Sequence, residues 1–201
     1  MKIQYITIER EYGSGGTKIA RETAARCGIA CYGSEILEEV ARKHHTDLDT
    51  LQEYEEKASS SFLYSMFVMT QSQTGDPDLL SHEGKLYVAQ TRIIRELADR
   101  GPAVFVGHCA SHALQDREGV LRVFIRAEDA DKERRIVADY GIDPDEVISV
   151  CRRFNRKRAN YYAFCTQKKW NDLQNYDVVL NSSQLGLDGC AAALAALYQG
   201  K

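Results

Sequence analysis

The 201-residue sequence lacks the features that mark several classes of protein. It has no run of about 18 apolar residues, so we expect no membrane-spanning segment and no membrane partner. It has no large excess of one charge, because 26 lysines and arginines stand against 29 aspartates and glutamates. This balance disfavours a protein that binds nucleic acid through its overall positive charge. The hydrophobic content of 44% is typical of a globular chain and disfavours disorder.

The six cysteines form no Cys-x-x-Cys motif and are spread along the chain. A chain of this length can bury its own core, so we expect reduced thiols rather than a disulfide framework. The apolar stretch at residues 3–8 is too short and too alternating for a secretion signal. We therefore expect a cytoplasmic protein. The sequence also lacks a Gly-x-Ser-x-Gly motif, so it does not support hydrolase chemistry.

Short apolar segments alternate with segments of helical periodicity. We predict strands at residues 3–8, 29–32, 103–107, 120–125 and 177–180. We predict helices at residues 17–27, 35–43 (with Ser34 as its N-cap), 47–57, 59–72, 82–99, 128–140, 144–163 and 187–198. This alternation is typical of an α/β fold in which helices cover both faces of a parallel sheet. Ligands of such sheets bind beyond the carboxyl ends of the strands, which here are followed by loops at residues 9–17, 107–112 and 181–186.

A glycine-rich loop links the first predicted strand to the first predicted helix. Gly13, Gly15 and Gly16 allow positive φ angles and a close approach of the backbone to a ligand. Their N–H groups and the start of the helix can hold an anion, most naturally a phosphate. A purely structural turn is the alternative. The predicted nucleotide contacts are Tyr12, Gly13, Ser14, Gly15, Gly16, Thr17 and Lys18. We expect Gly15→Val to crowd the anion and to spare the fold.

The loop matches the phosphate-loop pattern G-x-x-x-x-G-K-[ST] only in part. When Gly15 takes the second glycine position, Thr17 takes the hydroxyl position, which contacts the Mg²⁺ of a bound nucleotide. Gly16 then stands at the lysine position, and Arg10 stands at the first glycine position. The loop therefore has the shape of a phosphate loop without its usual cation. Arg10 and Lys18 are the candidates to supply that charge.

The segment ITIEREYGSGG at residues 6–16 resembles the opening of the cytidylate kinase-like proteins, a branch of the phosphate-loop nucleotide kinases. Later segments resemble the same family in the same order: VFVGHCA at 104–110, LRVFIRA at 121–127, KKWND at 168–172 and NYDVVLNSS at 175–183. The sequence departs from the family pattern at three places, one of which is Cys109-Ala110-Ser111, where the true cytidylate kinases have an acidic residue. Gly16 stands where the loop lysine is expected, and Gly107-His108 stands where Gly-Arg is common.

The resemblance implies a three-layer α/β fold of the phosphate-loop NTPase type, with a five-stranded parallel sheet and a helical lid. It implies one nucleotide-kinase-like domain over residues 1–201, with an inserted helical region at about 34–100 and a lid at about 143–171. The implied cofactors are ATP and Mg²⁺. The implied acceptor is a pyrimidine nucleoside monophosphate.

Residues 151–171 carry seven basic side chains and no acidic one. On a helix, Arg152 and Arg156 lie one turn apart, so their like charges stack unless an anion neutralises them. The resemblance places this segment in the lid, where arginine can stabilise charge during phosphoryl transfer. The candidate catalytic residues are Arg10, Arg152, Arg153, Arg156 and Arg158. A solvated basic face and an RNA-binding surface are the alternatives, although no RNA-binding motif accompanies the segment.

His108, Tyr161 and Tyr162 are the candidate substrate contacts: His108 lies at the end of a predicted strand, and the tyrosines, like Trp170, can stack on a base. His108 and His112 are also four residues apart, which on one helix face is half of a metal site.

We therefore expect a nucleotide-binding phosphotransferase, with a nucleotide and a small phosphate acceptor as its partners. Because the loop lysine is missing, a non-catalytic nucleotide- or phosphate-binding protein is the alternative. A third interpretation is an interaction protein whose apolar segment 62–69 forms a homodimer surface.

Overall fold

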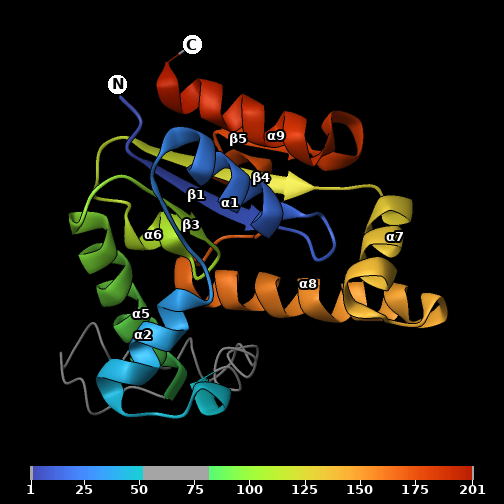
Figure 1. The fold of residues 1–201 in the computed structure, drawn as a ribbon. Coiled ribbons are helices and arrows are strands. Elements are labelled where there is room, and N and C mark those ends of the chain that lie inside the picture. Colours follow the sequence, from blue (N-terminus) through green and yellow to red (C-terminus); the bar gives the residue numbers. More distant parts are fainter. Residues whose placement is uncertain (1, 52–81, 201) are drawn as a thin grey trace.

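Five parallel strands form the centre of the computed structural model, which describes residues 2–51 and 82–200 (Figure 1). The strands are β1 (Tyr5–Arg10), β2 (Ala30–Tyr32), β3 (Ala103–Val106), β4 (Val120–Arg126) and β5 (Val178–Asn181). Their order across the sheet is β2-β3-β1-β4-β5, and every neighbouring pair is parallel. The predicted strands and the parallel sheet are confirmed, with small shifts at the strand ends. Because all strands run the same way, their carboxyl ends share one edge.

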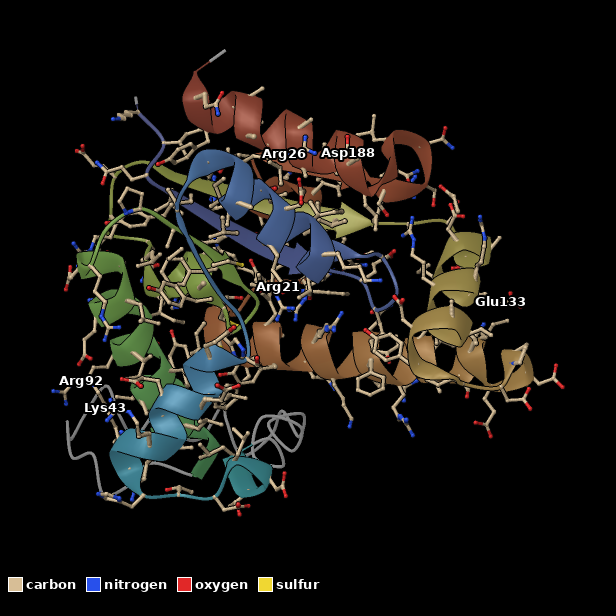
Figure 2. All side chains as sticks on the ribbon, in the orientation of Figure 1. Arg21, Arg26, Lys43, Arg92, Glu133 and Asp188 are labelled. Atoms are coloured by element: carbon tan, nitrogen blue, oxygen red, sulfur yellow. The ribbon has the colours of Figure 1, made fainter. Side chains whose placement is uncertain are left out.

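One face of the sheet is covered by α1 (Gly16–Cys27) and α9 (Ser182–Gln199). The core on this face joins Ile6 and Ile8 of β1 to Ile19 of α1 and Leu194 of α9, all of them buried. On the surface above this core, Arg26 and Asp188 form an ion pair between the two helices, and Figure 2 shows them side by side. The apolar runs of the sequence are therefore buried on both sides, as is usual in a parallel sheet.

The opposite face is covered by α2 (Glu35–His44), α5 (His82–Asp99), the short α6 (Ala110–Ala113) and α8 (Pro144–Thr166). Phe105 of β3 lies in the core formed with α2 and α5. A second, aromatic core lies between the sheet and α8 and includes Phe124, Tyr162, Trp170 and Tyr176. The helix α7 (Asp129–Tyr140) packs against α8, and a short 3-10 helix, η2 (Leu173–Asn175), leads to β5.

The helix ends follow local chemistry with two exceptions. Asp143 caps α8 by accepting the N–H of Asp145 (3.0 Å). The prediction that Ser34 caps α2 is wrong, because its side chain makes no capping hydrogen bond; the Glu35 carboxylate accepts the N–H of Gly33 (2.7 Å) instead. The last helix begins before residue 187, at Ser182, and Gly186 interrupts it with a φ of 70°.

The predicted helix at 59–72, the apolar dimer surface at 62–69 and most of the predicted helix at 47–57 lie outside the described residues. These predictions stay untested. Within residues 2–51 and 82–200, no helix has both the length and the apolar character needed to cross a bilayer.

Candidate active site

The glycine loop leaves β1 after Arg10 and enters α1 at Gly16. Gly13 and Gly15 both have a φ of 77°, a left-handed conformation that glycine adopts without strain. Gly15 is the N-cap of α1, and no side chain caps this helix, so its first N–H groups are open to an anion. A cavity of about 70 Å³ lies here and is lined by Tyr12, Gly13, Gly15, Gly16, Thr17 and Lys18 among others. We call it the loop cavity.

Ser14 is the one predicted nucleotide contact that does not line the loop cavity. It is fully buried, and its hydroxyl donates to the main-chain oxygen of Glu11 (2.8 Å). Behind it, Arg135 of α7 donates to the oxygen of Ser14 (3.0 Å) and to the hydroxyl of Ser182 (2.9 Å). The sequence analysis missed Arg135, which carries no motif. The segment 181–186, which we predicted as a ligand-binding loop after the last strand, contacts the glycine loop: the Ser182 hydroxyl donates to the main-chain oxygen of Ser14 (2.7 Å).

The back of Gly15 is packed against α9. A Cβ atom at this position would collide with Cδ2 of Leu187 rather than enter the loop cavity. The expectation that Gly15→Val spares the fold is therefore wrong, whereas its effect on anion binding stays a prediction. The substitution would act first on the packing between α1 and α9.

Two charged residues of the loop have partners on α7. The ammonium of Lys18 forms an ion pair with Asp139 (2.7 Å) on the surface. The carboxylate of Glu11 accepts hydrogen bonds from Lys132 Nζ and from the Ala127 N–H, both at 3.1 Å. These pairs hold α7 beside the glycine loop.

Tyr12 joins the glycine loop to α8. Its ring stacks on Phe154, with centroids 4.4 Å apart and planes 8° apart, and on Tyr140 of α7 (5.7 Å). Its N–H donates to Oδ1 of Asn155 (2.7 Å). The guanidinium of Arg158 lies 5.6 Å from the centre of the Tyr12 ring, a cation–π distance. Three contacts thus hold α8 against the loop, and the fourth joins the loop to α7.

A second cavity, of about 320 Å³, adjoins the first, and we call it the acceptor cavity. It is lined by Glu9, Arg10, Ser34, Leu37, Gly107, His108, Cys109, Phe154, Lys157, Arg158, Tyr161 and Tyr162. The three predicted substrate contacts all belong to this lining. Trp170 does not: its ring is 6% exposed, and its indole N–H donates to the Glu9 carboxylate (3.0 Å). The prediction that Trp170 stacks on a base is therefore not supported.

His108 is positioned by a residue that the sequence analysis missed. Gln90 of α5 is fully buried, and its side-chain nitrogen lies 3.5 Å from Nδ1 of His108. The hydroxyl of Tyr161 donates to the side-chain oxygen of the same Gln90. With its Nδ1 turned to Gln90, His108 presents Nε2 as its second polar atom. No sequence pattern marks Gln90, because its partners lie on other segments.

Arg10 and Arg158 line both cavities. The guanidinium of Arg158 donates to the main-chain oxygen of Arg10 (2.9 Å). Burial and the charge of Arg10 lower the pKa of Arg158 to about 9. Burial raises the pKa of Glu9, although the nearby Arg10 opposes this effect. Two cations held together away from water favour a bound anion.

The other three predicted arginines of α8 do not line either cavity. Arg152, Arg153 and Arg156 are exposed on the outer side of the helix, and Arg153 lies 5.3 Å from the centre of the Phe154 ring. Helical spacing places Phe154, Arg158 and Tyr161 on the inner face instead.

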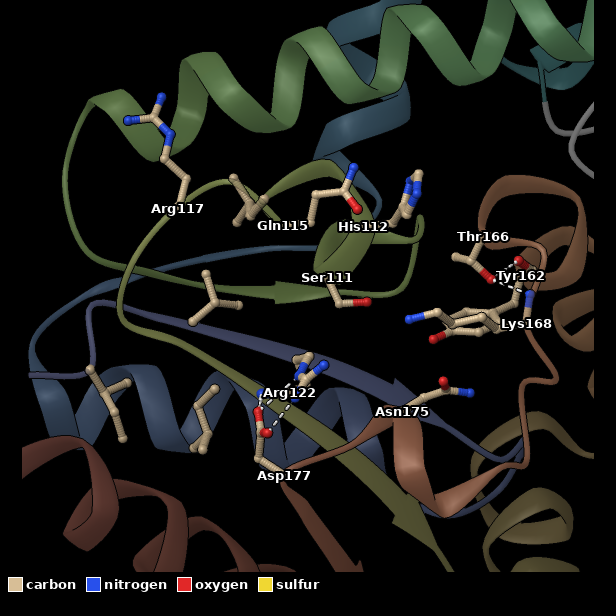
Figure 3. Close-up of a pocket in the computed structure, with 14 residues that line it drawn as sticks. Ser111, His112, Gln115, Arg117, Arg122, Tyr162, Thr166, Lys168, Asn175 and Asp177 are labelled. Atoms are coloured by element: carbon tan, nitrogen blue, oxygen red, sulfur yellow. Dashed lines mark hydrogen bonds and ion pairs between the residues drawn. The ribbon is translucent and has the colours of Figure 1, made fainter. Parts of the chain in front are cut away.

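His108 and His112 are not brought together. His108 precedes α6, with a φ of 55°, and lines the acceptor cavity. His112 lies in α6, 2.5 Å from the Tyr87 hydroxyl through Nδ1, and lines a separate cavity of about 390 Å³ with Arg122, Lys168 and Asp177 (Figure 3). No cluster of three metal-ligating side chains occurs in the part of the chain that the structure describes.

Comparison with known proteins identifies the family and the fold of the chain. The sequence model of the Cytidylate kinase-like family matches residues 5–184. No curated protein sequence matches the chain. A solved structure of an uncharacterized protein from Eubacterium ventriosum ATCC 27560 has a TM-score of 0.73 at 22% identity, and each chain is covered completely.

Two further solved structures share the fold. Shikimate kinase from Bacteroides thetaiotaomicron has a TM-score of 0.52 at 13% identity, with 97% of this chain and 98% of that chain covered. A gluconokinase from Sinorhizobium meliloti 1021 has a TM-score of 0.52 at 14% identity, with 100% and 97% covered. At these identities the likeness shows the fold alone, whereas the family match covers most of the sequence. The chain therefore has the fold of the phosphate-loop kinases and belongs to the cytidylate kinase-like family.

Proposed function

We propose that this protein is an ATP-dependent phosphotransferase, with the phosphates of ATP in the loop cavity and a small anionic acceptor in the acceptor cavity. One observation carries the proposal: Arg10 and Arg158 line both cavities and so lie where a phosphoryl group would pass from one to the other. Phosphoryl transfer depends mainly on positioning and on stabilising charge. Two cations at the boundary suit that requirement.

The residues around the two arginines have separate tasks in this proposal. The N–H groups at the start of α1 bind phosphate oxygens. During transfer, the bond between the γ-phosphorus and its bridging oxygen breaks, and a bond to an acceptor oxygen forms. Arg10 and Arg158 hold the charge on the phosphoryl oxygens meanwhile. The contacts of Tyr12 with Phe154 and Asn155 keep α8 over the loop, which excludes water.

The donor set also fits the Mg²⁺ of a bound nucleotide. Mg²⁺ in such sites keeps several waters and takes few protein oxygens. Thr17 is exposed and lines the loop cavity, so its hydroxyl is the protein ligand that we assign. When bound, Mg²⁺ neutralises phosphate charge. Glu9 and Glu11 are engaged with Trp170 and Lys132 and are not assigned to the ion.

We further propose that residues 143–171 act as a lid within a single domain formed by residues 1–201, and that residues 34–100 build the acceptor side. Ser34 and Leu37 already line the acceptor cavity. Arg152, Arg153 and Arg156 would meet a triphosphate only after a movement of α8, since they lie on its outer side. The clamp role of these three arginines stays a prediction, which the position of α8 in this structure does not support.

The acceptor cavity points to an acceptor that carries negative charge. Three cations line it (Arg10, Lys157 and Arg158), against the single carboxylate of Glu9. The family favours a pyrimidine nucleoside monophosphate, and Phe154 is the aromatic residue of the lining with most surface for its base, since Tyr161 and Tyr162 are almost fully buried. The structural neighbours named shikimate kinase and gluconokinase add two hydroxylated carboxylates, shikimate and gluconate, as acceptors to test.

A transfer assay tests the proposal. Purified protein is incubated with γ-labelled ATP, Mg²⁺ and each acceptor in turn: CMP, dCMP, UMP, shikimate and gluconate. We expect labelled product with one class of acceptor, formed about 10² to 10³-fold more slowly by the Arg158→Ala variant. ATP binding by calorimetry with no product for any acceptor would reject catalysis. It would favour the non-catalytic nucleotide-binding alternative, which the glycine at position 16 supports.

A further inference from the structure

We propose that the glycine and the cation of the phosphate loop have exchanged places in this protein, so that Arg10 performs the task of the missing lysine at position 16. The inference rests on the proposed function, because it concerns the phosphates of the same nucleotide. In the usual pattern the first position is glycine and the seventh is lysine. Here the first position is Arg10 and the seventh is Gly16.

The structure shows that the two positions compete for the same space. A Cβ atom built on Gly16 would lie 2.6 Å from Cβ and 2.8 Å from Cγ of Arg10. Real Cβ atoms do not approach so closely, and Cβ of Arg10 is fixed to β1, so it cannot swing away. A lysine at position 16 therefore clashes with any side chain at position 10 unless the backbone shifts. The loop holds one cationic side chain here or the other.

The guanidinium of Arg10 then reaches the boundary between the two cavities. It lies against Gly107, where a Cβ atom would collide with Nη1 of Arg10. Gly107 follows β3 at the same carboxyl edge of the sheet. Two glycines far apart in sequence thus leave room for the Arg10 side chain. Gly16 leaves room for its Cβ and Cγ atoms, and Gly107 leaves room for its guanidinium.

The other loop cation is less well placed. Lys18 is bound to Asp139 on the surface, with 60% of its side chain exposed, and it does not line the acceptor cavity. Arg158 does line both cavities, but it comes from α8 and not from the loop. Only Arg10 combines a position within the loop with contact to both cavities.

A set of loop variants tests the exchange. The variants are Arg10→Gly, Gly16→Lys, the double variant Arg10→Gly/Gly16→Lys, and Arg10→Ala/Gly16→Lys. The last retains a Cβ at position 10, so it keeps the clash that the third removes. Arg92→Ala is the control for loss of an arginine, because Arg92 is an exposed residue of α5 outside both cavities (Figure 2). Each protein is titrated with a fluorescent ATP analogue and Mg²⁺, and is melted without nucleotide.

We expect Arg10→Gly and Gly16→Lys each to weaken nucleotide binding by about tenfold or more, since each loses the cation or its placement. The Arg10→Gly/Gly16→Lys variant should recover to within a few fold of the wild type. Arg10→Ala/Gly16→Lys should not recover. Gly16→Lys should lower the melting midpoint of the wild-type protein. It should lower the midpoint of the Arg10→Gly variant much less.

Unchanged affinity of Arg10→Gly would overturn the inference while leaving nucleotide binding established. A Gly16→Lys midpoint that falls equally in both backgrounds would overturn it as well. If the wild type itself binds no nucleotide, the proposed function fails, and the role of Arg10 fails with it. The melting comparison still shows in that case whether positions 10 and 16 compete for space.

Discussion

The guanidinium of Arg158 donates a hydrogen bond to the main-chain oxygen of Arg10, at 2.9 Å, and so joins α8 to the last residue of β1. This bond places two cationic side chains next to each other at the carboxyl edge of the sheet. Like charges in a partly buried place cost free energy unless an anion lies between them. The Glu9 carboxyl offsets part of this cost, because it interacts with both arginines, and a bound phosphate would offset more of it.

Removal of the Arg158 side chain should reduce catalysis more than folding. We expect Arg158→Ala to lower the turnover number by about 10² to 10³-fold, the usual effect of losing one charge-stabilising donor. The measurement is ATP-dependent transfer to the best acceptor. Arg134→Ala is the matched control, because Arg134 is 75% exposed and lines neither cavity. An Arg158→Ala enzyme with wild-type turnover would contradict the assignment.

Binding of ATP with Mg²⁺ should stabilise the folded protein. At a ligand concentration of about 100 times the dissociation constant, linkage gives about 2.7 kcal/mol of added stability. Thermal unfolding with ATP and Mg²⁺, with ATP and EDTA, and with no ligand measures the effect. We expect the largest rise with Mg²⁺ and a smaller one with EDTA. A melting midpoint that does not respond to either mixture would count against the loop cavity as a nucleotide site.

Glu9 should make stability depend on pH. Burial raises its pKa above the ordinary value of 4.5, so the folded state holds a proton that the unfolded state has already released. The free energy of unfolding therefore falls as pH rises from the pKa of Glu9 in the unfolded state to its pKa in the folded state. The fall is about 1.4 kcal/mol for each unit by which the two pKa values differ. Glu9→Gln cannot ionise and still offers an oxygen to the Trp170 N–H.

Urea denaturation between pH 5 and pH 8 compares Glu9→Gln with the wild type. The variant should gain stability relative to the wild type as pH rises, and the gain should shrink towards pH 4.5. Glu22→Gln, on the exposed side of α1, serves as the control for replacement of a surface carboxylate. A Glu9→Gln variant that loses stability relative to the wild type with rising pH would refute the sign.

Gly15 and Leu187 should be energetically coupled. Gly15→Ala forces a side chain into a left-handed conformation and against Leu187, so we expect a loss of about 1 to 3 kcal/mol in the free energy of unfolding. In a Leu187→Ala background the clash is removed and only the backbone strain remains. Urea denaturation of the four proteins measures the coupling. An equal cost of Gly15→Ala in both backgrounds would show that no clash exists.

Much of the fold follows from short segments of sequence. The apolar run at residues 103–106 is buried completely in β3, because a parallel strand is covered on both faces. Gly141 ends α7 in a left-handed conformation, and Asp143 with Pro144 begins α8. The glycine loop also stands out locally, since strand, glycines and helix are neighbours in the chain. For such features, residues close in sequence supply the interaction that decides the structure.

The site was predictable only in part. Helical spacing shows that Arg152 and Arg156 share one side of α8, and that Arg158 lies on another. It does not show which side faces the sheet. That choice depends on the burial of Tyr161, Tyr162 and Cys165 against Phe124 and Tyr176, which belong to other segments. The exposure of three predicted clamp arginines is a consequence of that packing.

The sequence by itself determined the order of strands and helices, the family and the place of the glycine loop, because each is encoded in residues adjacent along the chain. Only the tertiary structure decided which cation serves the loop. It pairs Lys18 with Asp139 on α7, and it threads Arg10 between Gly16 and Gly107. These contacts join residues far apart in sequence. The partners of each basic side chain come together only when the chain folds, so the sequence does not show which of them lies at the loop.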